Sequence, residues 1–123
     1  MHPSALKAYQ KTQMDTLPGR ELEAEVLTKA AKFLLACQED WNASDRRAKL
    51  DEALKYNQLI WSVFQSELVK NDNPLPKELR ENLLNLSLFI DKRTYEIMAF
   101  PAPEKLTMII DINLNIAAGL RGE

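Results

Sequence analysis

The sequence contains few of the residues on which most catalytic and metal sites depend. It has one cysteine, Cys37, and one histidine, His2. A single thiol cannot form a disulfide within the chain, which fits a reducing compartment. A single histidine near the N-terminus excludes a catalytic triad of the serine or cysteine type and most zinc sites. We therefore expect a protein that is not an enzyme and that has no cofactor or resident metal.

Glycine and long apolar runs are also scarce. The three glycines leave no GxGxxG or GxxxxGK[ST] loop for a phosphate group. Asp111, Asn113 and Asn115 begin like a calcium loop, but Ile116 stands where that loop needs glycine and Gly122 where it needs glutamate. No apolar run approaches the roughly 18 residues that span a bilayer, and the first residues lack a secretory signal pattern. These absences predict a cytoplasmic protein with no membrane contact and no small-molecule substrate.

The charge balance argues against a general nucleic-acid-binding protein. The chain carries a net charge of −2, whereas such a protein needs a basic field to neutralise phosphates. Its basic residues are concentrated at Arg46 and Arg47, followed by Lys49, and at Lys92 and Arg93. Most clusters of this kind are solvated helix faces. The alternative is an RNA contact through Arg46, Arg47, Lys92 and Arg93, against which the acidic balance counts.

Apolar residues recur at spacings of three and four in four long segments, the period of an amphipathic helix. The predicted helices cover residues 20–41, 45–69, 76–98 and 104–120. Between them lie breaks that are rich in proline, asparagine and other helix-ending or helix-starting residues: Asn42-Ala43-Ser44-Asp45, Asn71-Asp72-Asn73-Pro74-Leu75-Pro76 and Phe100-Pro101-Ala102-Pro103. The fold class is therefore all-α, a compact bundle of four main helices in one domain, residues 1–123. A short helix at residues 5–9 precedes them, within a loosely ordered segment, residues 1–20.

Residues 57–89, two apolar helical halves joined by the second break, form the predicted centre of this bundle. Two such helices must fold back on each other to cover their apolar faces. Asn57 interrupts the apolar face of the first half, and two interpretations stay open: a buried amide that fixes helix register, or a wet residue at the edge. Trp61 and Trp41 are expected in the core.

The predicted buried face of the first helix follows one stripe, which other apolar residues widen. The stripe contains Leu22, Val26, Ala30, Phe33, Cys37 and Trp41, and the residues that widen it are Leu27, Ala31, Leu34 and Leu35. Within this stripe Cys37 is expected to be a small buried apolar residue rather than a nucleophile. The third helix is apolar over more than half of its circumference, so it is either central in the bundle or partly a docking surface. We take Phe64, Leu84, Leu88 and Phe89 as candidate partner-binding residues.

The arrangement of these motifs resembles the flagellar biosynthesis regulator FlaF family of α-proteobacteria. The resemblance spans nearly the whole chain and is carried by the following groups: Asn57, Trp61 and Leu68; Asn73, Leu75-Pro76, Leu79-Arg80 and Leu83; Ile110-Asp111-Ile112-Asn113, Ile116 and Gly119-Leu120; Ala8-Tyr9, Pro18, Glu21 and Glu23. The departure lies in the linker Phe100-Pro101-Ala102-Pro103, which is richer in proline than the family pattern.

The resemblance implies a cytoplasmic flagellar assembly factor that acts opposite the translational repressor FlbT. It further implies that the protein binds flagellin as an export chaperone and promotes flagellin synthesis and secretion. Flagellin termini are amphipathic helices, which a helical bundle with surplus apolar surface can cover. Two alternatives remain: a post-transcriptional regulator that acts with FlbT on flagellin mRNA, and a homodimer that buries the surplus apolar face.

Overall fold

The computed structural model describes residues 17–123, with side chains from Arg20 onward, and this part of the chain is helical and contains no strand. It contains α2 (Leu17–Glu39), α3 (Arg46–Leu68), α4 (Lys77–Ala99), the 3-10 helix η2 (Pro103–Leu106) and α5 (Thr107–Arg121). The prediction of an all-α fold with four main helices is confirmed. The short helix predicted at residues 5–9 lies outside the described residues.

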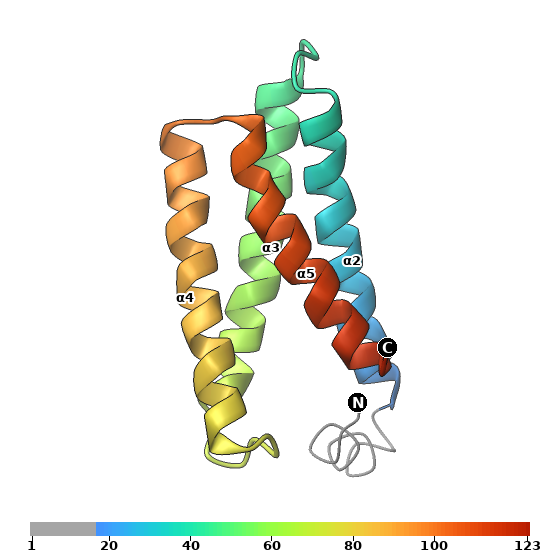
Figure 1. Cartoon of the computed structure of the whole chain (residues 1–123), viewed down its shortest axis with the longest axis vertical. Helices are drawn as coiled ribbons and strands as arrows, with labels where there is room; N and C mark the ends of the chain where they lie inside the picture. Colours follow the sequence, from blue (N-terminus) through green and yellow to red (C-terminus); the bar gives the residue numbers. More distant parts are fainter. Residues whose placement is uncertain (1–16) are drawn as a thin grey trace.

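The four long helices do not contribute equally to the bundle. Helix α5 crosses α2 in the most extensive contact of the described part, α3 packs along α2, and α4 lies at the side, where it packs against α3 (Figure 1). The predicted α3–α4 hairpin is present, but the centre of the fold is formed by α2, α3 and α5. Of the two interpretations of the third helix, the central one is therefore wrong.

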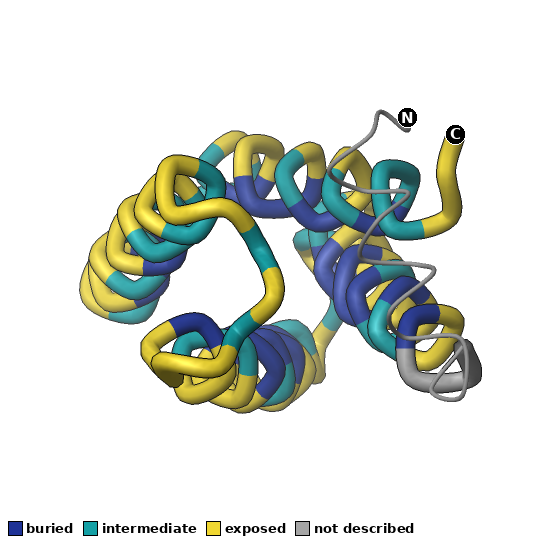
Figure 2. The backbone as a smooth tube through the Cα atoms, turned by 90° about the horizontal axis from the view of Figure 1, so that it is seen from below, coloured by how far each residue is buried: buried dark blue, intermediate teal, exposed yellow. Residues whose placement is uncertain are grey.

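The core consists of two apolar clusters along the bundle. One joins the end of α2, the start of α3 and the η2–α5 corner, and it includes Leu34, Leu54 and Ile109. The other joins α2, the second half of α3, α4 and the end of α5 around Trp61 and Ile90. Figure 2 shows that the buried residues of all the helices face this common interior.

Helix α2 begins earlier than predicted, and only part of its predicted face is buried. It begins at Leu17 rather than at residue 20. Pro18 is tolerated there because the N–H groups of the first turn have no partner within the helix in any case. Its buried face passes through Leu27 and Leu34, whereas Leu22 is 57% exposed and Phe33 is 41% exposed. The reason is that the face with Leu27 and Leu34 also carries several alanines, and small side chains let α5 approach closely: Ala24, Ala30 and Ala31.

The helix ends follow the predicted breaks with small shifts. Asp45 is the N-cap residue of α3 and makes no side-chain capping bond. Pro76 is the N-cap residue of α4 rather than its first residue. Gly122 ends α5 with φ of 80°, a left-handed conformation that favours glycine.

Candidate partner-binding groove

An apolar groove of about 330 Å³ opens at the end of the bundle where the chain passes from α3 to α4. Helices α2, α3, α4 and α5 and the α3–α4 loop surround it, and Figure 2 looks onto this end of the molecule. Its apolar lining consists of Trp61, Phe64, Leu68, Leu75, Leu79, Leu83, Ile116 and Leu120. Polar side chains stand at the edge: Arg20, Glu23, Glu67, Asn73 and Asn115.

A hydrogen-bonded network holds the aromatic wall of the groove in place. The indole Nε1 of Trp61 donates to Asn113 Oδ1 at 3.0 Å, and Asn113 Nδ2 donates to Asn57 Oδ1 at 2.6 Å. Both asparagines are fully buried, which confirms the interpretation of Asn57 as a buried amide. The Phe64 ring meets Trp61 edge to face, with centroids 5.6 Å apart. Because both hydrogen-bond partners in this chain of contacts are internal, the Trp61 ring is fixed before any ligand arrives.

A second polar network attaches α4, which carries two of the lining residues, to α3. Gln65 Nε2 donates to Ser87 Oγ at 3.0 Å and to Asp91 Oδ2 at 3.1 Å. Ser87 and Thr94 are buried on α4, and each hydroxyl donates to a carbonyl of its own helix. A hydroxyl that donates to its own helix can pack among apolar residues. The buried face of α4 therefore contains Ser87 and Thr94 beside its aliphatic residues.

The α3–α4 loop is folded so that Leu75 lines the groove. Asn73 Oδ1 accepts a hydrogen bond from the backbone N–H of Leu75 at 3.0 Å, and Asn73 Nδ2 donates to the Glu67 carbonyl at 3.0 Å. Arg80 Nη1 donates to the Lys70 carbonyl at 3.3 Å, which joins the first turns of α4 to the end of α3. The loop is therefore a defined wall of the groove.

The edge of the groove beside α2 is acidic and partly desolvated. Burial raises the pKa of the Glu23 carboxyl, which the nearby Glu67 carboxylate raises further and the Arg20 guanidinium opposes. Arg20 is itself buried, and its Nη2 donates to the Leu120 carbonyl at 2.8 Å, which ties the start of α2 to the end of α5. A ligand with basic groups beside its apolar face would therefore meet complementary charge at Glu23 and Glu67.

The structure does not bring the four predicted partner-binding residues into one surface. Phe64 lines the groove, and Leu84 is half-buried on α4. Leu88 is 62% exposed and Phe89 is 39% exposed on α4, and neither belongs to the groove lining. Sequence reasoning missed the groove because its lining comes from four helices and a loop, and Leu79 or Leu120 read equally well as core residues.

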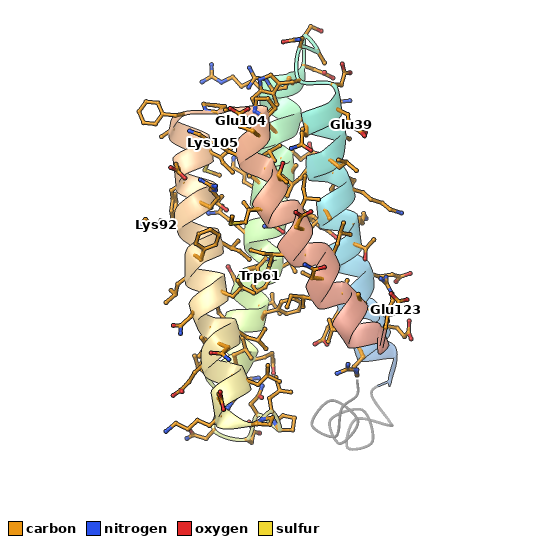
Figure 3. The ribbon with its side chains drawn as sticks, in the orientation of Figure 1. Glu39, Trp61, Lys92, Glu104, Lys105 and Glu123 are labelled. Atoms are coloured by element: carbon orange, nitrogen blue, oxygen red, sulfur yellow. The ribbon has the colours of Figure 1, made fainter. Side chains whose placement is uncertain are left out.

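The four predicted basic contact residues likewise lie on two helices, at the start of α3 and on α4. The Arg46 guanidinium lies 4.3 Å from the centre of the Trp41 ring, which is half-buried rather than in the core. Arg93 Nη1 donates to Glu96 Oε1 at 2.7 Å, and this bond lowers the pKa of the Glu96 carboxyl. Arg47 and Lys92 are exposed, and Lys92 lies on the side of α4 that faces away from the bundle (Figure 3).

The described residues also bear on the chemical and membrane predictions. Within residues 17–123 no group of three or more histidine, cysteine, aspartate or glutamate residues is placed to hold a metal ion. Cys37 is buried, and burial raises the pKa of its thiol, as expected for a small core residue. None of the helices of this part is both long and apolar enough to cross a membrane.

Comparison with known proteins identifies one family. The family model described as flagellar protein FlaF matches residues 5–120 of the chain. A search of curated proteins and a search of solved structures each gave no match.

Proposed function

The chain belongs to the FlaF family of flagellar proteins, and on this premise we propose that it binds flagellin as an export chaperone and thereby promotes flagellin synthesis and secretion. The observation that carries the proposal is the groove between the ends of α2, α3, α4 and α5. An unpolymerised flagellin terminus is an amphipathic helix, and an apolar groove beside other helices is a common receptor for such a helix.

The size and the lining of the groove fit one face of such a helix. Its volume of about 330 Å³ lies within the usual range for sites that take several apolar groups. The half-buried Phe64 supplies an aromatic surface of the kind that carries much binding energy at protein interfaces, and the fully buried Trp61 supports it from behind. Anchors spaced at i, i+3 or i+4, and i+7 on the flagellin helix would enter between Phe64, Leu79 and Leu83.

Calorimetric titration of purified flagellin into the protein tests this proposal. Leu79→Asp should weaken binding at least tenfold because it places a charge in the apolar lining. The variant should keep its helices, since Leu79 is half-buried in the first turn of α4, where a carboxylate interacts favourably with the helix dipole. Leu88→Asp is the matched control, because Leu88 lies on the same helix but outside the groove.

The same two variants distinguish the groove from the outer face of α4. If Leu88→Asp abolishes binding and Leu79→Asp does not, flagellin binds across Leu84, Leu88 and Phe89 instead. If the unmodified protein does not bind flagellin that can bind another partner, the chaperone proposal fails. The alternative would then be a regulator that acts with FlbT on flagellin mRNA, for which binding through Arg47 and Lys92 should weaken steeply with salt.

A further inference from the structure

The groove opens beside the point where residues 1–16 join the described part of the chain. Those residues connect to α2 at Leu17, and Arg20 and Glu23, within the first two turns of α2, already stand at the groove edge. We propose that residues 1–16 are a ligand of this groove within their own chain, and that they compete there with the flagellin helix. The competition rests on the function proposed above, whereas the intramolecular docking does not.

The sequence of this segment has the two properties that the groove selects. Leu6 and Tyr9 are apolar side chains three residues apart, the spacing of one helix face. Lys7 and Lys11 outnumber the one acidic residue of the segment, Asp15. The apolar pair matches the lining around Phe64 and Leu79, and the lysines match the acidic edge.

The acidic edge is where the docked segment would gain most from its lysines. Glu23 is partly buried beside Glu67, and burial together with this like charge raises the pKa of the Glu23 carboxyl. A cation at this edge would relieve the repulsion between the two carboxylates. Lys70 pairs with Glu67 at 3.0 Å on the exposed side. On the inner side the Arg20 guanidinium already opposes the rise in the pKa of Glu23, and a lysine of the segment would add to Arg20 there.

The connection is long enough for docking and short enough to favour it. Residues 10–16 separate Tyr9 from Leu17 and span at most about 24 Å when extended. Arg20 and Glu23 lie only about 5 Å and about 9 Å from Leu17 along the axis of α2. A tether of this length gives the attached segment an effective concentration of the order of millimolar at the groove, so weak intrinsic affinity suffices. The FlaF match begins at residue 5, so Leu6 and Tyr9 belong to the matched region rather than to an appended tail.

Paramagnetic relaxation measured by NMR on the full chain tests the docking. A nitroxide is attached at Ser4→Cys in a Cys37→Ala background, and amide signals are compared with the reduced label. We expect strong broadening at Leu79, Asn115 and Gly119 in the groove, and none at Glu39 or Lys105, which lie at the opposite end of the bundle (Figure 3).

Tethering alone would also broaden signals near α2, so a matched variant is needed. Leu6→Ser with Tyr9→Ser keeps the tether and the label but removes the apolar side chains. Broadening that falls in this variant supports docking, and broadening that stays unchanged overturns it. In a further control, ¹⁵N-labelled chain without a nitroxide is mixed with nitroxide-labelled chain that contains no ¹⁵N. Broadening in this mixture would show that the segment binds a second copy, which also overturns the intramolecular proposal.

Titration with flagellin tests the competition separately. If the segment occupies the groove about 80% of the time, Leu6→Ser with Tyr9→Ser should bind flagellin about fivefold more tightly than the unmodified chain. Docking without any gain in affinity would refute the competition. If neither protein binds flagellin, the chaperone function is refuted, and the relaxation data still decide whether the segment docks.

Discussion

Asn113 joins three helices through one buried side chain. Its Oδ1 accepts from the Trp61 indole on α3, and its Nδ2 donates to Asn57 on α3 and, at the longer distance of 3.4 Å, to the Leu27 carbonyl on α2. A buried amide that makes these contacts specifies how α5 is rotated against the other two helices. It also fixes Trp61, the largest side chain of the groove wall.

Removal of this amide should therefore cost stability. Asn113→Ala leaves the Trp61 N–H and the Asn57 carbonyl oxygen buried without these partners, and we expect a loss of about 2–4 kcal/mol in the free energy of unfolding. Urea unfolding followed by circular dichroism measures it. Asn115→Ala is the control, since Asn115 is exposed two residues away on α5. An equal loss in both variants would contradict this role for Asn113.

Glu23 gives the groove edge a pH dependence of defined sign. Its pKa is raised in the folded chain, mainly by burial, so between the unfolded and folded pKa values the folded state binds more protons. The free energy of unfolding contributed by this group therefore falls as pH rises through that window. Glu23→Gln removes the charge, and we expect the variant to gain stability relative to the unmodified chain between pH 4 and pH 7.

Urea unfolding of both proteins at the two pH values checks this expectation. Glu25→Gln, an exposed position on the same helix, serves as the control for the loss of one carboxylate. A stability difference between Glu23→Gln and the unmodified chain that stays constant with pH would show that the Glu23 carboxyl is not desolvated.

At the scale of the elements, the α3–α4 loop acts as a wall rather than as a linker. Asn73 bonds forward to Leu75 and backward to Glu67, a pattern in which an asparagine side chain replaces backbone hydrogen bonds of the turn. Pro74 and Pro76 restrict the backbone on both sides of Leu75. The position of Leu75 in the groove is thus determined by three neighbouring residues.

Asn73→Ala should loosen this wall. We expect a loss of about 1 kcal/mol in the free energy of unfolding, because two hydrogen bonds at the edge of solvent are removed. Flagellin affinity should fall severalfold, since Leu75 would no longer be held in the lining of the groove. Calorimetric titration of flagellin into Asn73→Ala measures this effect. Asn71→Ala, at an exposed position in the same loop, is the control. Unchanged affinity would mean that flagellin does not contact the loop.

At the scale of the whole molecule, α4 is the least embedded helix. It packs against α3 and touches η2, whereas α2, α3 and α5 form the common interior (Figure 1). Its buried side chains include only two aliphatic residues, Ile90 and Ile97, together with Ser87 and Thr94. Detachment of α4 would therefore expose less apolar area than separation of α2 from α5, and it should cost less free energy.

Amide hydrogen exchange should reveal this difference. The amides of Ile90 and Thr94 should exchange through an opening of lower free energy, and with a smaller dependence on denaturant, than those of Leu27 and Ala31 in α2. Exchange of all four amides at one common free energy would show that α4 separates only when the whole bundle unfolds. A partly detached α4 would widen the groove, because Leu79 and Leu83 move with it.

The sequence by itself determined the helices and, apart from the ends of α2, the approximate positions of their limits. Apolar spacing of three and four located all four long helices, and the proline-rich breaks located the turns. Gly122 ends α5 in a left-handed conformation, and the buried residues of α3 from Leu50 to Leu68 follow the same apolar spacing. These features follow from helix geometry and from backbone restrictions, which act over a few neighbouring residues.

Only the tertiary structure decided which face of α2 is buried, whether Asn57 is wet, and where an open apolar surface remains. Leu22 and Leu27 have the same chemistry, but α5 covers only the face that carries Leu27. Asn57 is buried because Asn113, 56 residues away, supplies its partner. The groove exists because α4 packs mainly on α3 and leaves part of the bundle end uncovered. How whole helices pack on one another leaves no local periodicity in the sequence, so it could not be predicted there.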